Sequence, residues 1–599
     1  MKQFIKLLLV FFVLTTVQFG LSACGGGTAD GGSGETVLDG NGDSIGDGFS
    51  ETSPDGDGGD DQTTSSISQH GITWTFAEPV TYGKFATGDY WVVGPVEITN
   101  ISPKSEVVTE NWTEPAFGEV NRIINGSMIN PDPNLDETQG YDSQMYGYPR
   151  DYGLDYDAAL NVGRPNNAEI SPDNSLIVYS GSSLISTISH SYAELVEKNT
   201  KVFIRSAAIL TVLNSAPPDN SFRPPYCGTD KSVNWQIDDL DYSILANLAP
   251  VDWTPELSQV EANFERSWLE QSREWTVGNM HPAENMPYYG RNLAFTIGDA
   301  ALMLNLNFTN AQKEFLFSRM VQLGIDFTGF FDAGGFFPHN GGIHQGRKLP
   351  ILIAGYALDD SHMQDVGNWR IHAEQWNGEV LTLPFQEDAQ TFYVTAEDVA
   401  IDHIGRDGNA EDYTADDIGM PEWGIQHQTE NYNDDKRYEA GYRLINGRSM
   451  SGHALVAHIM GLIDAWNHDA FFDYQDRWWE MDYDPTTDFY HQGGADTTFA
   501  RSMWLNYRDD YGPVWSETDS NPEAIIIDHD SVDAFDNIPE SYINQIKGMT
   551  IQWVGQSHGR QVPHGLELLA AEDSRFAVQI DTNLDVLVKS NRTHNQNTL

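Results

Sequence analysis

The chain has 599 residues, of which 40% are hydrophobic and 12% aromatic, so it is long enough to bury a sizeable core. At about 150 residues per domain, two to four domains are expected. Asp and Glu number 88 against 33 for Lys and Arg, and the formal net charge of -55 argues against nucleic acid or an anionic lipid surface as a partner. Cys227 is the only cysteine besides Cys24, which excludes a disulfide framework.

The first 24 residues have the order of a secretory signal. Lys2 and Lys6 precede the apolar run 7–14, and the small-residue stretch 21–23 ends on Cys24. Leu-Ser-Ala-Cys resembles the lipobox of bacterial lipoproteins, which implies lipidation of Cys24 and a lipid-anchored place in the bacterial cell envelope, at the outer membrane or cell surface. Because no later apolar run is long enough to span a bilayer, the anchor is the only expected membrane contact. The alternative is an ordinary signal peptide with a chance cysteine.

Residues 25–69 are mostly Gly, Asp, Ser and Thr, a composition that favours a disordered tether because it offers little apolar surface to bury. Within it, Asp39, Asn41, Asp43 and Asp47 alternate with small residues and resemble the calcium-binding repeats of thrombospondin type 3. The resemblance implies a possible calcium site, since this hard cation takes oxygen ligands. A solvated acidic linker is the alternative.

From 70 to 245 the chain favours strands. Apolar runs at 72–76, 90–98, 175–179 and 207–213 alternate or are continuous, and Gly and Pro punctuate them. We therefore expect a β-rich, sandwich-like domain over this range.

From 250 to 515 the apolar period changes to that of helices. Val260, Phe264 and Trp268 lie at helical spacing, and the same pattern recurs over 293–304 and 315–323. Continuous apolar segments at 350–357 and 452–462 predict two further helices. The predicted fold class is α+β and multidomain, with helical hairpins joined by long polar loops.

One of these loops gathers an unusual number of hydrogen-bond donors for so acidic a chain. His339, Asn340, His344, Arg347 and Lys348 fall within ten residues, directly before the helix that begins near 349. Helix N-termini carry partial positive charge, so this loop is a candidate site for an anionic group. The alternative is a helix-capping loop whose histidines bond to the backbone.

Two other loop-to-helix junctions carry similar side chains. The upstream junction holds His281, Tyr288, Tyr289, Arg291 and Asn292, and the downstream one holds Glu422, Trp423, His427, Tyr438, Glu439, Tyr442 and Arg443. Any single member of these sets is more often a structural residue than a catalyst.

A β-rich module followed by a helical body with His, Asn, Tyr and Arg in its loops resembles the polysaccharide lyases of the (α/α) toroid type, which include alginate, heparin and ulvan lyases. The resemblance covers about 70–515, rests on this layout and on the 339–348 loop, and implies an incomplete toroid. It also implies β-elimination on a uronate-containing polysaccharide, for which no cofactor is required. The implied neutralising groups are Asn340, His339 and Arg347, the base is His344 or Tyr289, and the acid is Tyr438 or Tyr442. Arg291, Lys348, His427 and Trp423 would bind the substrate.

Two other function classes stay open. A glycoside hydrolase would use paired carboxylates, such as Glu422 with Glu430 or Asp434. A glycan-binding surface lipoprotein would use the tryptophans without chemistry, although Trp423, Trp466, Trp478 and Trp479 at helical spacing are more often core. A zinc site is not expected, because His339 and His344 have no third ligand at a recognised spacing.

The last segment, 522–599, alternates strand and helix patterns and predicts a short α/β unit. Gly555-Gln556-Ser557 resembles the first block of carbohydrate esterases of the SGNH type. In that family the Asp and His follow well over a hundred residues later, beyond Leu599. A serine without them is a poor nucleophile, so an inert or truncated segment is expected.

Overall fold

A computed structural model describes residues 62–113, 118–135, 138–145, 156–164, 169–273, 277–287, 289–339, 341–374, 380–403, 411–424, 443–480 and 498–515. The lipobox with Cys24, the residues Asp39, Asn41, Asp43 and Asp47, and the segment 522–599 lie outside the described residues. Within these ranges the fold is mixed α and β, as the sequence predicts.

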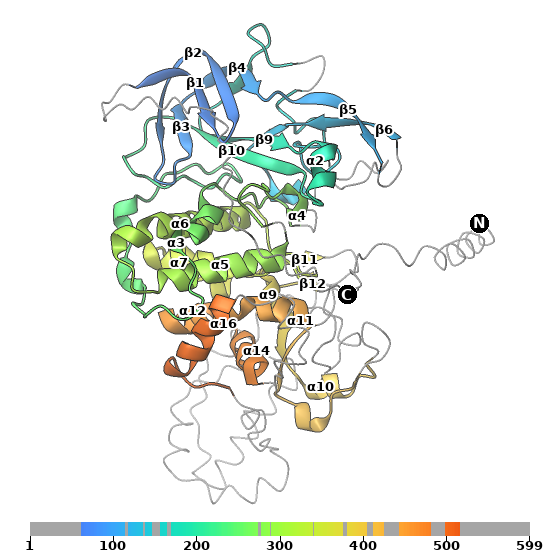
Figure 1. Ribbon diagram of the computed structural model, residues 1–599, viewed down its shortest axis with the longest axis vertical. Coiled ribbons are helices and arrows are strands. Elements are labelled where there is room, and N and C mark those ends of the chain that lie inside the picture. The colour runs from blue at the N-terminus through green and yellow to red at the C-terminus, as the bar shows by residue number, and fades with distance from the viewer. Residues whose placement is uncertain are drawn as a thin grey trace, which may run out of the picture. The chain divides into compact units, whose positions relative to one another are not determined.

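Eight strands form one curled sheet in the order β7-β9-β10-β3-β2-β4-β8, with β1 paired to β2 (Figure 1). Strands β5 and β6 form a separate antiparallel hairpin, and in the large sheet only β10 and β3 run parallel. The runs predicted as strands lie in β2, β3, β4, β8 and β10. The strands are β1 (Thr63–Gln69), β2 (Ile72–Lys84), β3 (Tyr90–Val93), β4 (Val96–Ser102), β5 (Glu106–Trp112), β6 (Gly118–Ile124), β7 (Ser127–Ile129), β8 (Leu176–Val178), β9 (Ser182–Ser189) and β10 (Ile204–Leu213).

The predicted end of the tether at residue 69 is wrong, because Thr63–Gln69 form β1. This strand pairs with β2 over Ser66↔Thr75 to Gln69↔Ile72. Backbone hydrogen bonds to the neighbouring strand and one buried apolar side chain, Ile67, are enough to hold it there. A prediction from composition misses such a polar edge strand, because the backbone hydrogen bonds that hold it do not depend on side-chain type.

Strand β10 lies between β9 and β3, and every residue of it except Arg205 is buried. Its continuous apolar run reflects burial on both faces rather than on one. One face packs in a cluster with Ile72, Trp74 and Val92, and the other faces a larger core that continues into the helices.

In the helical part the two longest helices each pack side by side with another helix, α6 with α7 and α5 with α12 (Figure 1). Where α5 crosses α12, Gly298 faces Gly452 so closely that a Cβ on Gly452 would lie 3.1 Å from the Gly298 Cα. The predicted helices at 293–304, 315–323, 350–357 and 452–462 are confirmed. The helices are α2 (Tyr192–Glu197), α3 (Leu257–Glu261), α4 (Val277–Met280), α5 (Gly290–Leu304), α6 (Asn310–Asp332), α7 (Lys348–Ala357), α8 (Ser361–Gln364), α9 (Gln386–Gln390), α10 (Ala396–Val399), α11 (Arg443–Asn446), α12 (Ser451–Met460), α13 (Ile463–Trp466), α14 (Asp469–Glu480) and α16 (Thr498–Tyr507).

Short strand pairs connect these helices: β11 (Ala373–Glu374) with β12 (Val380–Leu381), and β13 (Thr391–Tyr393) with β14 (Pro421–Trp423). Among the helices of the described ranges, none has the length and apolar character needed to cross a membrane.

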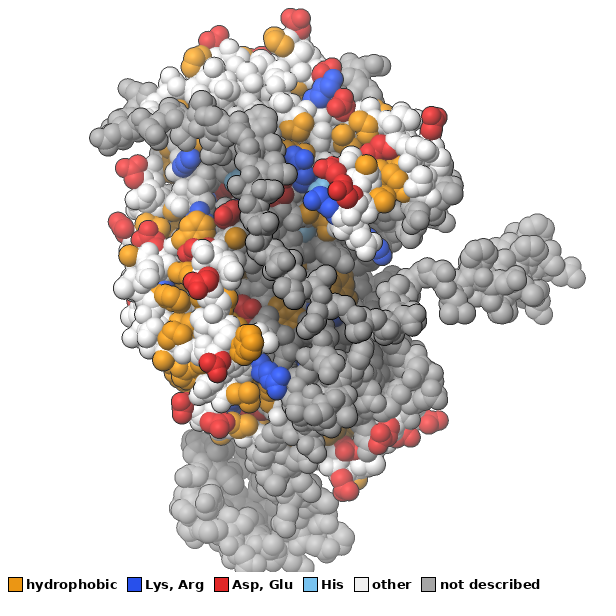
Figure 2. All heavy atoms as spheres, in the orientation of Figure 1, with side chains coloured by type: hydrophobic (Ala, Val, Ile, Leu, Met, Phe, Trp, Pro, Cys, Tyr) orange, Lys and Arg blue, Asp and Glu red, His pale blue; other side chains and the backbone are white. Residues whose placement is uncertain are grey.

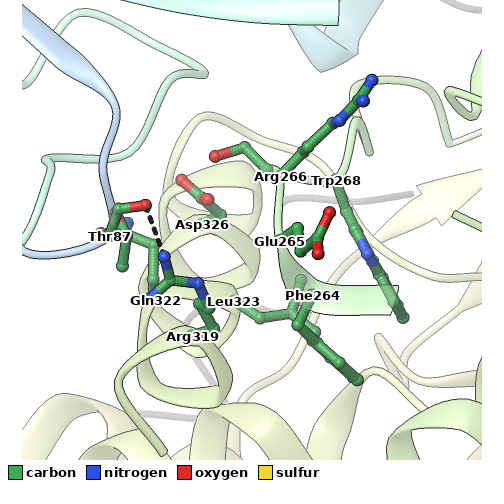
Figure 3. Close-up of a pocket in the computed structure, with 10 residues that line it drawn as sticks. Thr87, Phe264, Glu265, Arg266, Trp268, Arg319, Gln322, Leu323 and Asp326 are labelled. Atoms are coloured by element: carbon green, nitrogen blue, oxygen red, sulfur yellow. Dashed lines mark hydrogen bonds between the residues drawn. The ribbon is translucent and has the colours of Figure 1, made fainter. Parts of the chain in front are cut away.

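Arg223 ties the strand-rich part to the helical part. Its guanidinium is fully buried, donates to Asp89 at 2.8 Å, and donates to both carboxylate oxygens of Asp326 in α6 at 3.0 and 2.6 Å. A small cavity adjoins this ion-pair cluster, and there Arg319 of α6 donates to the Thr87 carbonyl at 3.0 Å (Figure 3). A buried, fully paired arginine of this kind fixes how the two parts meet.

Candidate functional site

The loop 341–348, which ends on the first residue of α7, is the centre of a buried polar network. Glycines let it approach its neighbours: Gly346 has a φ of +91°, and a Cβ on Gly290 at the start of α5 would lie 2.1 Å from the Ile343 carbonyl oxygen. Any larger residue at these positions would push the loop away from α5. The sequence thus places the loop against the helix that carries Tyr289 and Arg291 at its start.

Arg347 and Glu270 form a buried ion pair inside this network. Both side chains are at most 1% exposed, and the guanidinium contacts Glu270 Oε1 and also donates to the Gln345 carbonyl at 2.8 Å. His281 lies on the same carboxylate, with its Nε2 3.3 Å from Glu270 Oε1 and its Nδ1 2.9 Å from the Pro287 carbonyl oxygen. Burial alone raises the pKa of Glu270, but Arg347 and His281 reverse this and lower it to about 2.

His344 is a neutral imidazole with one unused nitrogen. Its Nδ1 lies 3.1 Å from the Pro338 carbonyl oxygen, which can only accept, so the proton is on Nδ1 and Nε2 carries a lone pair. Within the described residues Nε2 is buried and has no hydrogen-bond partner. Burial and the charge of Arg347 lower the pKa of His344 to about 3, and Glu270 opposes that lowering.

Lys348 is held by partners in α9 and α13. Its ammonium donates to Asp388 at 2.5 Å and to the Trp466 carbonyl at 2.6 Å, and the Trp466 indole donates to Asp388 at 2.9 Å. Next to Asp388, Glu387 accepts from the Gly346 backbone N–H at 3.2 Å. Burial and the neighbouring Asp388 raise the pKa of Glu387 to about 7. Two carboxyl groups with well separated pKa values, Glu270 and Glu387, therefore contact this one loop.

Amide side chains continue the network toward β14. Gln386 accepts from the His344 backbone N–H at 2.7 Å and donates to Gln390 at 2.9 Å, and Gln390 in turn accepts from the Trp423 indole at 3.0 Å. Asn446 of α11 donates to the Gly341 carbonyl at 2.6 Å. Apart from the bond between Gln386 and Gln390 within α9, each of these bonds joins segments that are far apart in the sequence.

Glu422 ends the network in β14. It contacts the guanidinium groups of Arg443 and Arg477 and accepts from the Tyr413 hydroxyl at 3.0 Å. Because two cations and a phenol hold this buried carboxylate, it resembles a structural ion cluster more than an acid or base poised for catalysis.

Tyr289 and Arg291, which flank the loop at the start of α5, are half-buried. The Arg291 guanidinium lies 5.7 Å from the centre of the Tyr289 ring, and the Tyr289 hydroxyl lies 2.7 Å from where a Gly342 Cβ would be. His339, by contrast, is only 2% exposed. The accessible side of the site is therefore the start of α5.

The predicted site residues thus have different surroundings. The structure brings His344, Arg347 and Lys348 together with Tyr289 and Arg291 around the loop, and Trp423 joins them through Gln390. Trp423, Trp466 and Trp478 are buried in the helical core, which is the more common role of tryptophans at helical spacing. Asn340, Tyr288, His427, Glu430, Asp434, Tyr438, Glu439 and Tyr442 lie outside the described residues.

Glu270, Glu387 and Asn446 belong to the network but were not singled out from the sequence. Glu387 and Asp388 carried a weak signal, because two adjacent acids follow Phe385 inside a short helix, α9, that proves to be buried. Glu270 carried none, since it is an isolated acid 77 positions from its partner Arg347.

Acidic side chains are spread over the described face in Figure 2, whereas Arg347, Lys348 and Arg443 are buried. In the described ranges no group of three His, Cys, Asp or Glu side chains is placed to hold a metal ion. Comparisons with protein-family models, with curated proteins and with solved structures found no match for this chain.

Proposed function

We propose that this protein is a surface-anchored enzyme that cleaves a uronate-containing polysaccharide by β-elimination, with its site at the loop 341–348 and the start of α5. The proposal includes the finer architecture expected from the sequence, a sandwich-like β-domain followed by an incomplete (α/α) toroid. The observation that carries it is the gathering of Tyr289, Arg291 and a neutral His344 at one place in a chain of net charge -55.

The chemistry requires three tasks, and the residues present suit them. The C5 proton of a uronate is weakly acidic beside an ionised carboxylate, so a cation must first offset that charge. Arg291 is half-buried and suited to this task, together with His339 and Asn340. The charge of Arg347 is already offset by Glu270, so this arginine positions the loop rather than the substrate.

A base must then take the C5 proton, and an acid must protonate the leaving glycosidic oxygen. Tyr289 is the accessible candidate for the base, because its hydroxyl lies beside the loop and its ring next to a cation. His344, whose Nε2 has no hydrogen-bond partner among the described residues, is the alternative base. Tyr438 and Tyr442 stay the proposed acids.

The test is the rise of unsaturated product, followed by its ultraviolet absorbance, on alginate, ulvan and glycosaminoglycan panels. Tyr289→Phe should lower kcat by about 100-fold or more with the fold intact, because general acid–base groups contribute on that order. Tyr356→Phe, which changes a half-buried tyrosine of α7, is the matched control. Full activity of Tyr289→Phe would move the base to His344, and full activity of His344→Ala as well would end the proposal for this loop.

A second candidate function rests on the two carboxyl groups of the network. Glu270, with a pKa of about 2, stays ionised, while Glu387, with a pKa of about 7, can hold a proton near neutrality. Such a pair is what a glycoside hydrolase uses as base or nucleophile and as acid, and Glu270 would take that role by leaving Arg347 and His281 for the substrate. New reducing ends without unsaturated product in the same assay would favour this hydrolase over the lyase.

A further inference from the structure

A cleft of about 570 Å³ lies on another part of the molecule, where the segment after β7 and the loop 225–235 face the second half of α6 and the start of α8. Its volume is in the range that takes a small organic ligand or a short oligosaccharide. The loop 341–348 contributes no residue to its lining, so the cleft is separate from the site described above.

The lining of this cleft carries negative charge from four aspartates. Asp132, Asp230, Asp332 and Asp360 line it, and among the residues that the structure describes no Lys or Arg does. Lys231 follows Asp230 in sequence but is only 8% exposed, and its ammonium donates instead to nearby backbone carbonyls, at 2.8 Å to Pro225 and Gly228. A polyanion such as a uronate chain would be repelled from such a surface, whereas a cation would be attracted.

The carboxylates are held in place. Backbone N–H groups donate to the Oδ1 atoms of Asp132, Asp230 and Asp360 at 2.8 to 2.9 Å, and His362 lies 2.9 Å from Asp332 Oδ1. For Asp132, Asp332 and Asp360, the second oxygen accepts no hydrogen bond from the part of the chain that the structure describes. A carboxylate that is already held through one oxygen can bind an ammonium group through the other without a large loss of side-chain conformational entropy.

Neutral groups complete the lining. Trp235 is half-buried and contributes an aromatic ring, and Asn130 and Asn234 contribute amides that can both donate and accept. An aromatic face suits a sugar ring or an ammonium group, and amides suit hydroxyls.

A metal ion fits this cleft poorly. In the described ranges no three acidic or histidine side chains are placed to hold one metal ion, so no three of these aspartates converge on one point. Carboxylates that do not share one ion suit a ligand that carries several separate positive charges.

We propose that this cleft binds an oligosaccharide bearing free amino groups, such as a glucosamine oligomer. Each ammonium group would meet one of the aspartates, a sugar ring would stack on Trp235, and the asparagine amides would take hydroxyls. The proposal is independent of the lyase activity, because the cleft and its ligand differ in place and in sign of charge from the loop 341–348 and a uronate.

The experiment is calorimetric titration of the full chain with a glucosamine tetramer, its fully N-acetylated counterpart and spermine, at low ionic strength. We expect the glucosamine tetramer to bind at least about tenfold more tightly than either of the other two. The acetylated tetramer lacks the charge and spermine lacks the rings. Asp230→Asn/Asp332→Asn keeps an acceptor oxygen at each position and should weaken binding by about tenfold, because it removes two of the four negative charges that would meet the ammonium groups.

The matched control is Asp173→Asn/Asp219→Asn, which removes the same charge from two exposed aspartates outside the cleft and should leave binding unchanged. Trp235→Ala, with a thermal melt as the folding control, should lower affinity for the sugar but not for spermine. Equal loss in the control pair would show a general effect of the acidic surface and overturn the proposal. Binding of the acetylated tetramer or of spermine as tight as that of the amine-bearing sugar would overturn it too.

Discussion

Glu270 holds the loop 341–348 through one buried ion pair, and its removal tests how much that pair contributes. In Glu270→Gln, the Arg347 guanidinium would stay buried without a counter-charge. We expect the free energy of unfolding to fall by about 3 to 5 kcal/mol, as breaking one partner of a buried pair usually costs. Urea unfolding measures it.

Glu256→Gln is the control for that change, since Glu256 is exposed and makes no side-chain hydrogen bond as the N-cap of α3. Its effect should stay within about 0.5 kcal/mol. A loss below about 1 kcal/mol for Glu270→Gln would mean that Arg347 finds another partner and that the pair does not fix the loop.

Helix α6 carries Asp326 and Gln322, which bond to Arg223, and it begins with a capping box. The Thr309 hydroxyl accepts from the Gln312 backbone N–H at 3.3 Å, and the Gln312 side chain accepts from the Thr309 N–H at 3.0 Å. Thr309→Ala should lower the free energy of unfolding by about 1 kcal/mol, because the first turn loses a partner for its N–H groups. Thr309→Ser keeps the hydroxyl and should recover most of that loss in the same urea titration. An alanine variant as stable as the serine variant would contradict a role for this cap.

Three buried histidines should make the whole molecule sensitive to mild acid. Burial lowers the pKa of His344 and His458 to about 3 and that of His453 to about 4, from an ordinary value of 6.5. Below pH 6.5 the unfolded chain takes up protons that the folded chain does not, so stability falls as the pH falls, by up to about 1.4 kcal/mol per pH unit for each histidine.

Glu387 acts in the opposite direction over part of this range. Its raised pKa of about 7 means that the folded chain holds the extra proton between pH 4.5 and 7, so this contribution is lost as the pH rises. The pKa of the buried Asp326 is likewise raised, to about 6, so two carboxyls act in this direction. The three histidines, whose pKa values are lowered further, outweigh them, and urea unfolding at pH 6.5, 5.5 and 4.5 should show a steady loss. Constant stability over these three values would contradict the buried, neutral state of the histidines.

The proposed lipid anchor is a property of the whole chain. Cys24→Ala should abolish retention in the membrane fraction, because acyl chains on Cys24 are the only anchor that the sequence predicts. Cys227→Ala, which changes the buried thiol of the described region, should fractionate as the unchanged protein does. Membrane retention of Cys24→Ala would rule the lipid anchor out.

The sequence by itself determined the elements whose burial is uniform along their length. The strand at 207–213 in β10 and the helix α5 were predictable, because each element buries apolar side chains in a regular pattern. The loop 339–348 was also predictable as a candidate site, because five hydrogen-bond donors within ten residues are unusual in an acidic chain. The strand at Thr63–Gln69 was not, since its pairing depends on backbone bonds and not on apolar side chains.

Only the tertiary structure decided what the donors in that loop do. Arg347 meets Glu270 and Lys348 meets Asp388 across 77 and 40 residues of chain, and no local pattern specifies such partners. The folded chain therefore set which cations are already neutralised and left Arg291 and Tyr289 accessible beside a neutral His344. The cleft lined by four aspartates likewise exists only where the loop 225–235 meets α6, because its walls come from segments that carry no shared sequence signal.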